Sequence, residues 1–302
     1  MNSIDFEHRT FPFAEFNPVQ SAAIPHVEHD VNMVIASPTA TGKTVIAECL
    51  MAFESITHPG CKSIYMSPLK SLSGQKHEEW SRDHQFSEIG VELITGDSDG
   101  GKADECGIIV TTIECFDSRV RSGAFSNIVE ASKVLIVDEA HIIGSEDRGD
   151  HAESALMRFS QRNPGARIVL LSATVSNSTE IASWVKSLNG KDTIKIASSW
   201  RPSIPKVMYV ERDGSYKEDL NTALDSVRQA KHGDKTIVFV HSKRFGRDLC
   251  DRIKRAGIQC AFHNADLQRN KRKMIEQAFN SKIGGLDVLV STSTLSMGVN
   301  IA

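Results

Sequence analysis

The segment that most constrains the fold is Ser37–Thr44, which reads Ser-Pro-Thr-Ala-Thr-Gly-Lys-Thr. It follows the apolar run Val34–Ala36 and precedes Val45–Leu50, whose pattern is typical of a helix. A strand, a glycine-containing loop and a helix in this order form a cradle for phosphate groups, because backbone N–H groups and a helix N-terminus converge on the anion. The alternative is an ordinary helix start that contains glycine. The segment predicts a nucleotide site, with Lys43 near the outer phosphates and the Thr44 hydroxyl on a magnesium ion.

Beyond this loop, short β-branched runs alternate with segments of helical period. Such alternation predicts an α/β protein in which helices flank parallel sheets. The predicted strands are residues 33–36, 63–67, 91–94, 108–111, 133–137 and 167–171, followed by 236–240, 259–262 and 286–290. Pro202, Pro205 and the polar stretch 211–215 separate the two groups, which predicts one domain over residues 1–212 and a second over residues 213–302.

The second domain has predicted helices near residues 216–231, 243–256 and 267–281 but only three predicted strands. Open α/β sheets of this kind have about five strands. We therefore expect the second domain to be incomplete and the chain to be truncated.

The composition, with 40% hydrophobic and 24% charged residues, is typical of a soluble, well-packed protein. No apolar stretch reaches the roughly 18–20 residues that a bilayer requires, and the first five residues do not resemble a signal peptide. The six cysteines include no Cys-x-x-Cys pair, so neither a zinc site nor a disulfide framework is indicated. We expect a cytoplasmic protein, or a nuclear one in a eukaryote, that is monomeric and has no membrane partner.

The charge is distributed unevenly along the chain. Residues 213–302 carry 15 Lys and Arg against 10 Asp and Glu, whereas residues 1–212 carry 20 against 28. The basic residues of the second domain gather in Lys243–Arg247, Arg252–Arg255 and Arg269–Lys273. One such cluster is typical of a solvated helix face, but three together indicate a surface that faces a polyanion.

Two adjacent carboxylates, Asp138 and Glu139, end the predicted strand at 133–137. Ligands of parallel sheets bind at the carboxyl ends of the strands, and neighbouring side chains there point to opposite faces. Asp138 can then hold the magnesium ion through its water shell, while Glu139 orients and deprotonates the attacking water. An acidic turn at a strand end is the alternative, and the phosphate loop upstream favours the catalytic interpretation.

Ser172 and Thr174 follow the predicted strand at 167–171 and present two hydroxyl groups at the same edge of the sheet. Such hydroxyls are suited to sensing the state of a bound nucleotide. They are also good caps for the helix predicted near Asn177.

Taken in order, these segments resemble the motifs of superfamily 2 helicases with a DExH box. The similarity is greatest to the lineage of archaeal lagging-strand repair helicases, the helicase domain of polymerase theta and exosome-associated RNA helicases. The matching segments are collinear and cover nearly the whole chain: residues 16–20, 36–44, 67–72, 95–97, 109–118, 138–141, 148–149, 172–174, 200–202, 238–243, 262–267 and 290–300.

The resemblance implies two tandem RecA-like domains that use ATP and Mg²⁺ to move along single-stranded or forked nucleic acid with 3′–5′ polarity. The segments 106–112 and 200–202 favour DNA over RNA as the partner. An RNA helicase of the same lineage is the alternative substrate class, since backbone contacts dominate in both cases.

The resemblance also implies roles for individual residues. The catalytic residues are Lys43, Asp138 and Glu139, and the metal ligands are Thr44 and Asp138. ATP contacts fall on Gln20, whose amide would bond the adenine edge, and on Ser37, Pro38, Thr39, Ala40, Thr41, Gly42, Lys43 and Thr44. Residues that couple ATP to movement are His141, Ser172, Thr174 and Gly298. Nucleic-acid contacts fall on Pro68, Lys70, Thr95, Gly96, Thr111, Thr112, Ser242, Lys243 and Thr292.

Two departures from the family pattern affect these expectations. Ala40 and Thr41 replace the usual Gly-Ser of the phosphate loop, and alanine lacks the freedom of glycine to take positive φ, so loop geometry is affected while ATP binding is expected to survive. The 302 residues also contain no Gln-x-x-Gly-Arg-x-Gly-Arg element, whose arginines are worth about 10³–10⁵ in rate. We expect weak hydrolysis and no processive unwinding by this chain alone.

Two other classes of function stay compatible with parts of the pattern. One is a non-catalytic, ATP-switched module that binds nucleic acid, although intact Lys43, Asp138 and Glu139 argue against it. The other is a phosphoryl-transfer enzyme for small molecules, which the Thr95–Gly96 and Thr111–Thr112 pairs disfavour.

Overall fold

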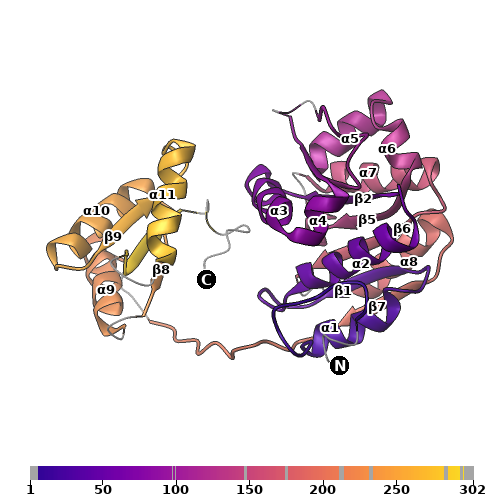
Figure 1. Cartoon of the computed structure of the whole chain (residues 1–302). Coiled ribbons are helices and arrows are strands. Elements are labelled where there is room, and N and C mark those ends of the chain that lie inside the picture. Colours follow the sequence, from indigo (N-terminus) through magenta and orange to yellow (C-terminus); the bar gives the residue numbers. More distant parts are fainter. Residues whose placement is uncertain are drawn as a thin grey trace. The chain divides into compact units, whose positions relative to one another are not determined.

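The structure is a computed structural model of the chain (Figure 1). It describes residues 6–96, 98, 100–145, 148–173, 176–210, 214–230, 234–281, 285–292 and 295. The chain divides into two compact units, Met1–Pro205 and Lys206–Ala302, with the division slightly ahead of the boundary predicted at residue 212. Each unit holds a parallel sheet flanked by helices, so the predicted α/β class is confirmed.

The first unit is built on a seven-stranded sheet in the order β3-β4-β2-β5-β6-β1-β7, and every neighbouring pair is parallel. The strands, in chain order, are β1 (Asn32–Ala36), β2 (Lys62–Ser67), β3 (Val91–Ile94), β4 (Ile108–Thr112), β5 (Ser132–Val137), β6 (Arg167–Ser172) and β7 (Thr193–Ala197). Because all strands run the same way, their carboxyl ends meet at one edge of the sheet.

The helices of this unit cover both faces of the sheet. They are α1 (Pro18–Ala23), η2 (Ile24–His26), α2 (Lys43–Thr57), α3 (Lys70–Arg82), α4 (His84–Ile89), α5 (Ile113–Ser122), α6 (Ser126–Glu130), η3 (Ala140–Ile142), α7 (Gly149–Arg162) and α8 (Ser178–Asn189). Alternate residues of each central strand enter opposite cores, which explains why β1, β2, β4 and β6 are buried along their whole length.

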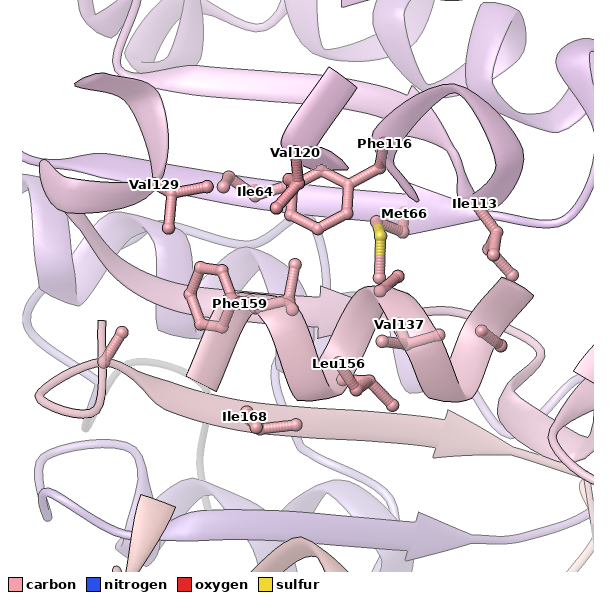
Figure 2. Close-up of a cluster of buried hydrophobic side chains, with 14 of the residues drawn as sticks. Ile64, Met66, Ile113, Phe116, Val120, Val129, Val137, Leu156, Phe159 and Ile168 are labelled. Carbon is pink, nitrogen blue, oxygen red and sulfur yellow. The ribbon is translucent and has the colours of Figure 1, made fainter. Parts of the chain in front are cut away.

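One core lies between the sheet and the helices α5, α6, α7 and α8. Figure 2 shows part of it, with Phe116 and Val120 of α5 near Ile64 of β2 and with Phe159 on α7. The other core joins the opposite face to α1, α2, α3 and α4, and it includes Tyr65. Burial of whole apolar side chains on both faces is the main stabilisation of such a sheet.

The sequence analysis missed β7. Among the strands that the structure describes, β7 pairs only with β1 and forms an edge of the sheet, and Ile196 is its one buried side chain. An edge strand with a single buried residue lacks the apolar run that identifies a central strand.

The second unit has a parallel sheet of three described strands in the order β8-β10-β9. Its elements are α9 (Tyr216–Gln229), β8 (Thr236–Phe239), α10 (Lys243–Arg255), β9 (Cys260–His263), α11 (Arg269–Asn280) and β10 (Val288–Ser291). These elements agree with the predicted strands and helices of this half. Among the helices in the described ranges, none is both long enough and apolar enough to cross a bilayer.

Candidate functional site

The predicted phosphate loop connects β1 to α2 at the carboxyl edge of the first sheet. Its backbone turns through two residues in the left-handed region, Ala40 with φ of 61° and Gly42 with φ of 69°. Gly42 is the residue before the first turn of α2, which begins at Lys43. The first N–H groups of a helix have no partner within the helix, so the N-terminus of α2 offers donors to an anion.

Ala40 takes the left-handed turn although its Cβ disfavours it. The cost of this conformation for a residue with a Cβ is about 1–2 kcal/mol. The Thr41 hydroxyl donates to the Pro38 carbonyl at 2.9 Å and shares a hydrogen bond of 2.8 Å with the Ser37 hydroxyl. The alanine therefore leaves strain in the loop, and buried hydroxyl bonds hold the loop in this shape.

Lys43 is buried, with 8% of its surface exposed, at the first turn of α2. Its ammonium group donates to the carbonyl oxygens of Ser37 and Pro38, both at 3.0 Å. Burial lowers the pKa of Lys43, while the negative charges of Glu139 and Asp138 act in the opposite direction. The predicted catalytic lysine and both predicted carboxylates thus share one electrostatic environment.

Asn17 and Gln20 support the loop from α1. The side-chain amide of Asn17 donates to the Thr41 carbonyl at 2.9 Å, and that of Gln20 donates to the Gly42 carbonyl at 3.1 Å. The Gln20 oxygen accepts the Asn17 backbone N–H at 3.0 Å, which completes a capping box. A Cβ at Gly42 would lie 2.5 Å from the Gln20 amide nitrogen. Gln20 therefore anchors the loop, and adenine recognition by this residue stays a prediction.

Asp138 and Glu139 follow the end of β5, two strands from β1 in the sheet. One Asp138 oxygen accepts the Glu139 backbone N–H at 2.9 Å, and the other accepts the hydroxyl of Tyr65 from β2. Burial raises the pKa of Asp138, and the Tyr65 hydrogen bond offsets part of this effect. Tyr65 is a residue that the sequence analysis missed, because its partner lies 73 positions away and no local pattern connects them.

Glu139 has φ of 51°, a left-handed conformation that is rare for a residue with a side chain. Its carboxylate lies 3.3 Å from Nδ1 of His141, which is on the 3-10 turn η3. The hydrogen bond to His141 lowers the pKa of Glu139, and the same bond raises the pKa of His141. Glu139 is thereby held ionised, and its backbone departs from the extended path of β5.

Ser172 joins β6 to the phosphate loop, since its carbonyl accepts the Ser37 backbone N–H at 3.2 Å. Its hydroxyl is buried and has no hydrogen-bond partner among the described residues. Thr174, its predicted companion, lies outside the described residues. Ser172 ends β6, which lies between β5 and β1 in the sheet, so its hydroxyl stands between the ends of the strands that lead to Asp138 and to Ser37.

The residues at this edge of the sheet are of the chemical types that bind the phosphates of a nucleotide and Mg²⁺. The N-terminus of α2 and Lys43 supply donors and positive charge for phosphates. Thr44 is half-buried on the first turn of α2 and carries a hydroxyl, and Asp138 supplies a half-buried carboxylate. A hydroxyl, a carboxylate and phosphate oxygens are the hard ligands that Mg²⁺ prefers.

The predicted nucleic-acid contacts of the first unit lie at or just after the carboxyl ends of β2, β3 and β4, which are neighbours in the sheet. Lys70 and Gly96 are exposed, and a Cβ at Gly96 would lie 3.6 Å from the Lys70 ammonium nitrogen. The remaining residues of the set are buried: Pro68, Thr95, Thr111 and Thr112. Lys70 and Gly96 are therefore accessible to a strand of nucleic acid, while the buried residues shape the loops.

The buried threonines have structural partners. The Thr112 hydroxyl accepts the Cys115 N–H at 3.4 Å and caps α5, and the Thr111 hydroxyl donates to the Thr112 carbonyl at 3.3 Å. The predicted contacts of these two hydroxyls with nucleic acid stay predictions.

In the second unit, Ser242, Lys243 and Thr292 all lie near the carboxyl ends of the three strands. Ser242 caps α10 by accepting the Phe245 N–H at 3.4 Å. Lys243 forms an ion pair with Asp266 at 2.6 Å, and about half of each side chain is exposed. Such a pair contributes little to stability and exchanges readily with a phosphate. The predicted coupling residue Gly298 lies outside the described residues.

Two protein-family models match the chain. The DEAD/DEAH box helicase model covers residues 17–181, and the helicase conserved C-terminal domain model covers residues 217–302. The first match includes the phosphate loop and the Asp138–His141 segment.

Curated relatives are similar over most of this chain. ATP-dependent DNA helicase Hel308 of Pyrococcus abyssi is 33% identical over 95% of this chain and 44% of its own length. ATP-dependent DNA helicase MER3 of Saccharomyces cerevisiae is 31% identical over 96% of this chain and 28% of its own length. The chain thus spans less than half the length of these relatives.

Solved structures share the fold. Mycobacterium smegmatis helicase Lhr bound to ssDNA and AMP-PNP matches with a TM-score of 0.72 and 24% identity, over 96% of this chain and 41% of Lhr. S. cerevisiae Dbp5 bound to RNA and ADP BeF3 matches with a TM-score of 0.70 and 21% identity, over 100% of this chain and 78% of Dbp5. The predicted tandem RecA-like fold is confirmed by these similarities.

Proposed function

The chain belongs to the DEAD/DEAH box helicase family, and from this premise we propose that it binds ATP with Mg²⁺ and single-stranded nucleic acid as part of an ATP-dependent helicase. The observation that supports this most is that Lys43, at the N-terminus of α2, is buried and subject to the negative charges of Glu139 and Asp138. Bound Mg²⁺ would neutralise phosphate charge. Lys43 would bind the outer phosphates, and Glu139 would accept the proton of the attacking water.

DNA is the favoured partner because Hel308 and MER3 are both named as DNA helicases. The exposed Lys70 and Gly96 in the first unit and Lys243 in the second suit contacts with a phosphate backbone, which carry no sequence information. We propose that the chain holds a single strand by these residues without preference for base sequence. An RNA strand is the alternative partner, as in the structure of Dbp5.

We also propose that binding of ATP exceeds its turnover in this polypeptide. The 302 residues contain no Gln-x-x-Gly-Arg-x-Gly-Arg element, and cationic fingers of that kind accelerate hydrolysis by about 10³–10⁵. Glu139→Gln should leave ATP affinity within about threefold and abolish the residual hydrolysis. Equal turnover in single-turnover assays of the variant and the natural chain would show that Glu139 is not the base.

Titration of a fluorescent ATP analogue with Mg²⁺ tests the nucleotide site. Lys43→Ala should weaken binding at least tenfold, because it removes the buried charge near the phosphates. Lys195→Ala, an exposed lysine on β7, is the matched control and should leave affinity unchanged. Full affinity in the Lys43 variant would refute the proposed site.

Filter binding to a single-stranded oligonucleotide over a salt series tests the nucleic-acid partner. For a protein that binds a polyanion, the logarithm of the binding constant falls linearly with the logarithm of the salt concentration. For a single strand the slope is about −0.7 for each phosphate contact. Parallel measurements with DNA and RNA of the same sequence should favour DNA. A flat salt response would exclude backbone binding, and tighter RNA binding would assign the chain to the alternative partner.

A further inference from the structure

The side chain of Arg148 connects three segments of the first unit. Arg148 lies directly before α7, and its Nε donates to a carboxylate oxygen of Glu114 at 2.6 Å. Its Nη2 donates to the carbonyl oxygen of Pro68 at 2.5 Å. About one third of each of the Arg148 and Glu114 side chains is exposed. One guanidinium therefore binds two segments that lie 34 and 80 positions before it in the chain.

 

One partner of Arg148, Pro68, is itself predicted to contact nucleic acid, and the other, Glu114, lies close to two such residues in the sequence. Pro68 follows β2 and stands two positions before the exposed Lys70. Glu114 lies in the first turn of α5, two positions after Thr112. Arg148 therefore holds the segment after β2 against the first turn of α5, which directly follows β4.

On its other side, Arg148 is joined to Glu139 through a short series of backbone hydrogen bonds. Ile142 N–H donates to the Glu139 carbonyl at 3.1 Å, Ser145 N–H to the Ile142 carbonyl at 2.9 Å, and Gly149 N–H to the Ser145 carbonyl at 3.0 Å. A Cβ at Gly149 would lie 2.8 Å from the Gly144 backbone nitrogen, so these turns pack closely. A shift of Glu139 is therefore expected to move the segment that carries Arg148.

We propose that Arg148 is a positioning residue that couples the ATP site to the nucleic-acid loops of the first unit, an inference that rests on the proposed function. Arg148 is not among the residues predicted to contact ATP or nucleic acid, and it links the segment after Glu139 to Pro68 and Glu114. A partly exposed ion pair contributes little to stability, so a role in stabilising the fold alone accounts poorly for this arrangement. Coupling between two sites is reciprocal, and it typically changes each affinity about 5- to 150-fold.

The same pair of helices offers a matched control. Arg158 of α7 forms an ion pair with Asp117 of α5 at 2.6 Å, and neither residue contacts Pro68 in the structure. Arg158→Gln therefore removes an arginine–carboxylate contact between α7 and α5 while leaving the Arg148 contacts in place. Any effect of loosening these helices in general appears in both variants.

Linkage between the two ligands tests the proposal in the full chain. The dissociation constant of a fluorescent, non-hydrolysable ATP analogue with Mg²⁺ is measured with and without a saturating single-stranded oligonucleotide. The ratio of these two dissociation constants should be at least fivefold in the natural chain and in Arg158→Gln. Arg148→Gln should bind each ligand alone within about threefold of the natural chain but show a ratio near one. Glu114→Gln, which keeps Arg148, should reduce the ratio in part.

Hydrogen exchange gives a second readout that needs no oligonucleotide. The ATP analogue alone should slow exchange in peptides covering residues 68–74 and 111–118 in the natural chain and in Arg158→Gln, but not in Arg148→Gln. Failure of oligonucleotide binding in the natural chain would count against the proposed function, while this exchange result would still stand. An Arg148→Gln variant that keeps both the linkage and the exchange response would overturn the proposal.

Discussion

At the scale of single residues, the site depends on two backbone conformations that side chains disfavour. Ala40 and Glu139 are the described residues other than glycine with positive φ, and they lie in the phosphate loop and at the predicted base. Strain of this kind persists only where surrounding contacts hold it. Here the Thr41 hydroxyl and the Glu139–His141 hydrogen bond supply such contacts.

Replacement of Ala40 by glycine should stabilise the first unit. Glycine takes positive φ without steric cost, and the gain is partly offset by the greater freedom of glycine in the unfolded chain. The net effect should be an increase of about 1 kcal/mol or less in the free energy of unfolding, measured in urea by tryptophan fluorescence. Ala22→Gly, at an exposed position in α1, is the control and should have the opposite sign. A loss of stability in Ala40→Gly would contradict the assignment of strain.

The Glu139–His141 pair should make stability depend on pH. The pKa of Glu139 is lowered from its ordinary value of 4.5, so its contribution is present above pH 4.5 and lost as pH falls through the lowered pKa. The pKa of His141 is raised from 6.5, so its contribution is present below pH 6.5 and lost as pH rises through the raised pKa. The pair therefore stabilises the fold most between pH 4.5 and 6.5.

His141→Gln should accordingly destabilise the chain most in that pH window. Because both side chains are partly exposed, the loss should be about 0.2–1 kcal/mol, measured by urea unfolding over a pH series. His84→Gln is the control, since His84 and Glu88 are 3.7 Å apart and mostly exposed. A loss in His141→Gln that is constant across the pH range would argue against the ion pair.

At the scale of elements, Arg167 at the start of β6 ties three segments together. Its Nε donates to Glu54 of α2 at 2.7 Å, and its Nη1 donates to the carbonyls of Val27 and His29 at 2.6 and 2.7 Å. The Arg167 and Glu54 side chains are 2% and 5% exposed. Removal of one partner from such a buried pair leaves an uncompensated charge.

Arg167→Met should therefore destabilise the first unit by about 3–5 kcal/mol in urea unfolding. Adding Glu54→Leu should recover much of the loss, because no unpaired charge then stays buried. Lys186→Met, which breaks the exposed pair with Asp192, should change stability by less than about 0.5 kcal/mol. A double variant as unstable as Arg167→Met would show that lost packing, and not the unpaired charge, is the cause.

At the scale of the whole molecule, the two units have separate hydrophobic cores. Residues of the first unit form two of the clusters, and residues of the second unit form the other two. All three tryptophans, Trp80, Trp184 and Trp200, lie in the first unit. Tryptophan fluorescence therefore follows unfolding of the first unit, while circular dichroism follows both units.

A nucleotide that binds the first unit should raise the melting temperature only of the transition that fluorescence detects. At a ligand concentration of about 100 times the dissociation constant, the expected stabilisation is about 2.7 kcal/mol. The melting temperature of the second unit, seen as the remaining part of the circular dichroism change, should stay the same. Thermal melts with and without the ATP analogue and Mg²⁺ make this comparison. Equal shifts in both signals would mean that the units unfold together.

Much of this protein follows from local patterns in its sequence. Apolar runs predict the buried strands, and the Ser37–Thr44 segment and the Asp138–Glu139 pair mark the nucleotide site, because each consists of contiguous residues with their own spacing. The edge strand β7 escaped prediction because its single buried side chain leaves no such pattern.

The tertiary structure alone decided the partners of these motifs. Strand order brings Tyr65 to Asp138, and it brings Arg148 to Pro68 and Glu114. These contacts join residues 34 to 80 positions apart, and their existence depends on which strands are neighbours and in which register. Contiguous residues carry the periodicity that selects a strand or a helix, whereas long-range hydrogen bonds arise only when the packed sheet brings distant side chains together.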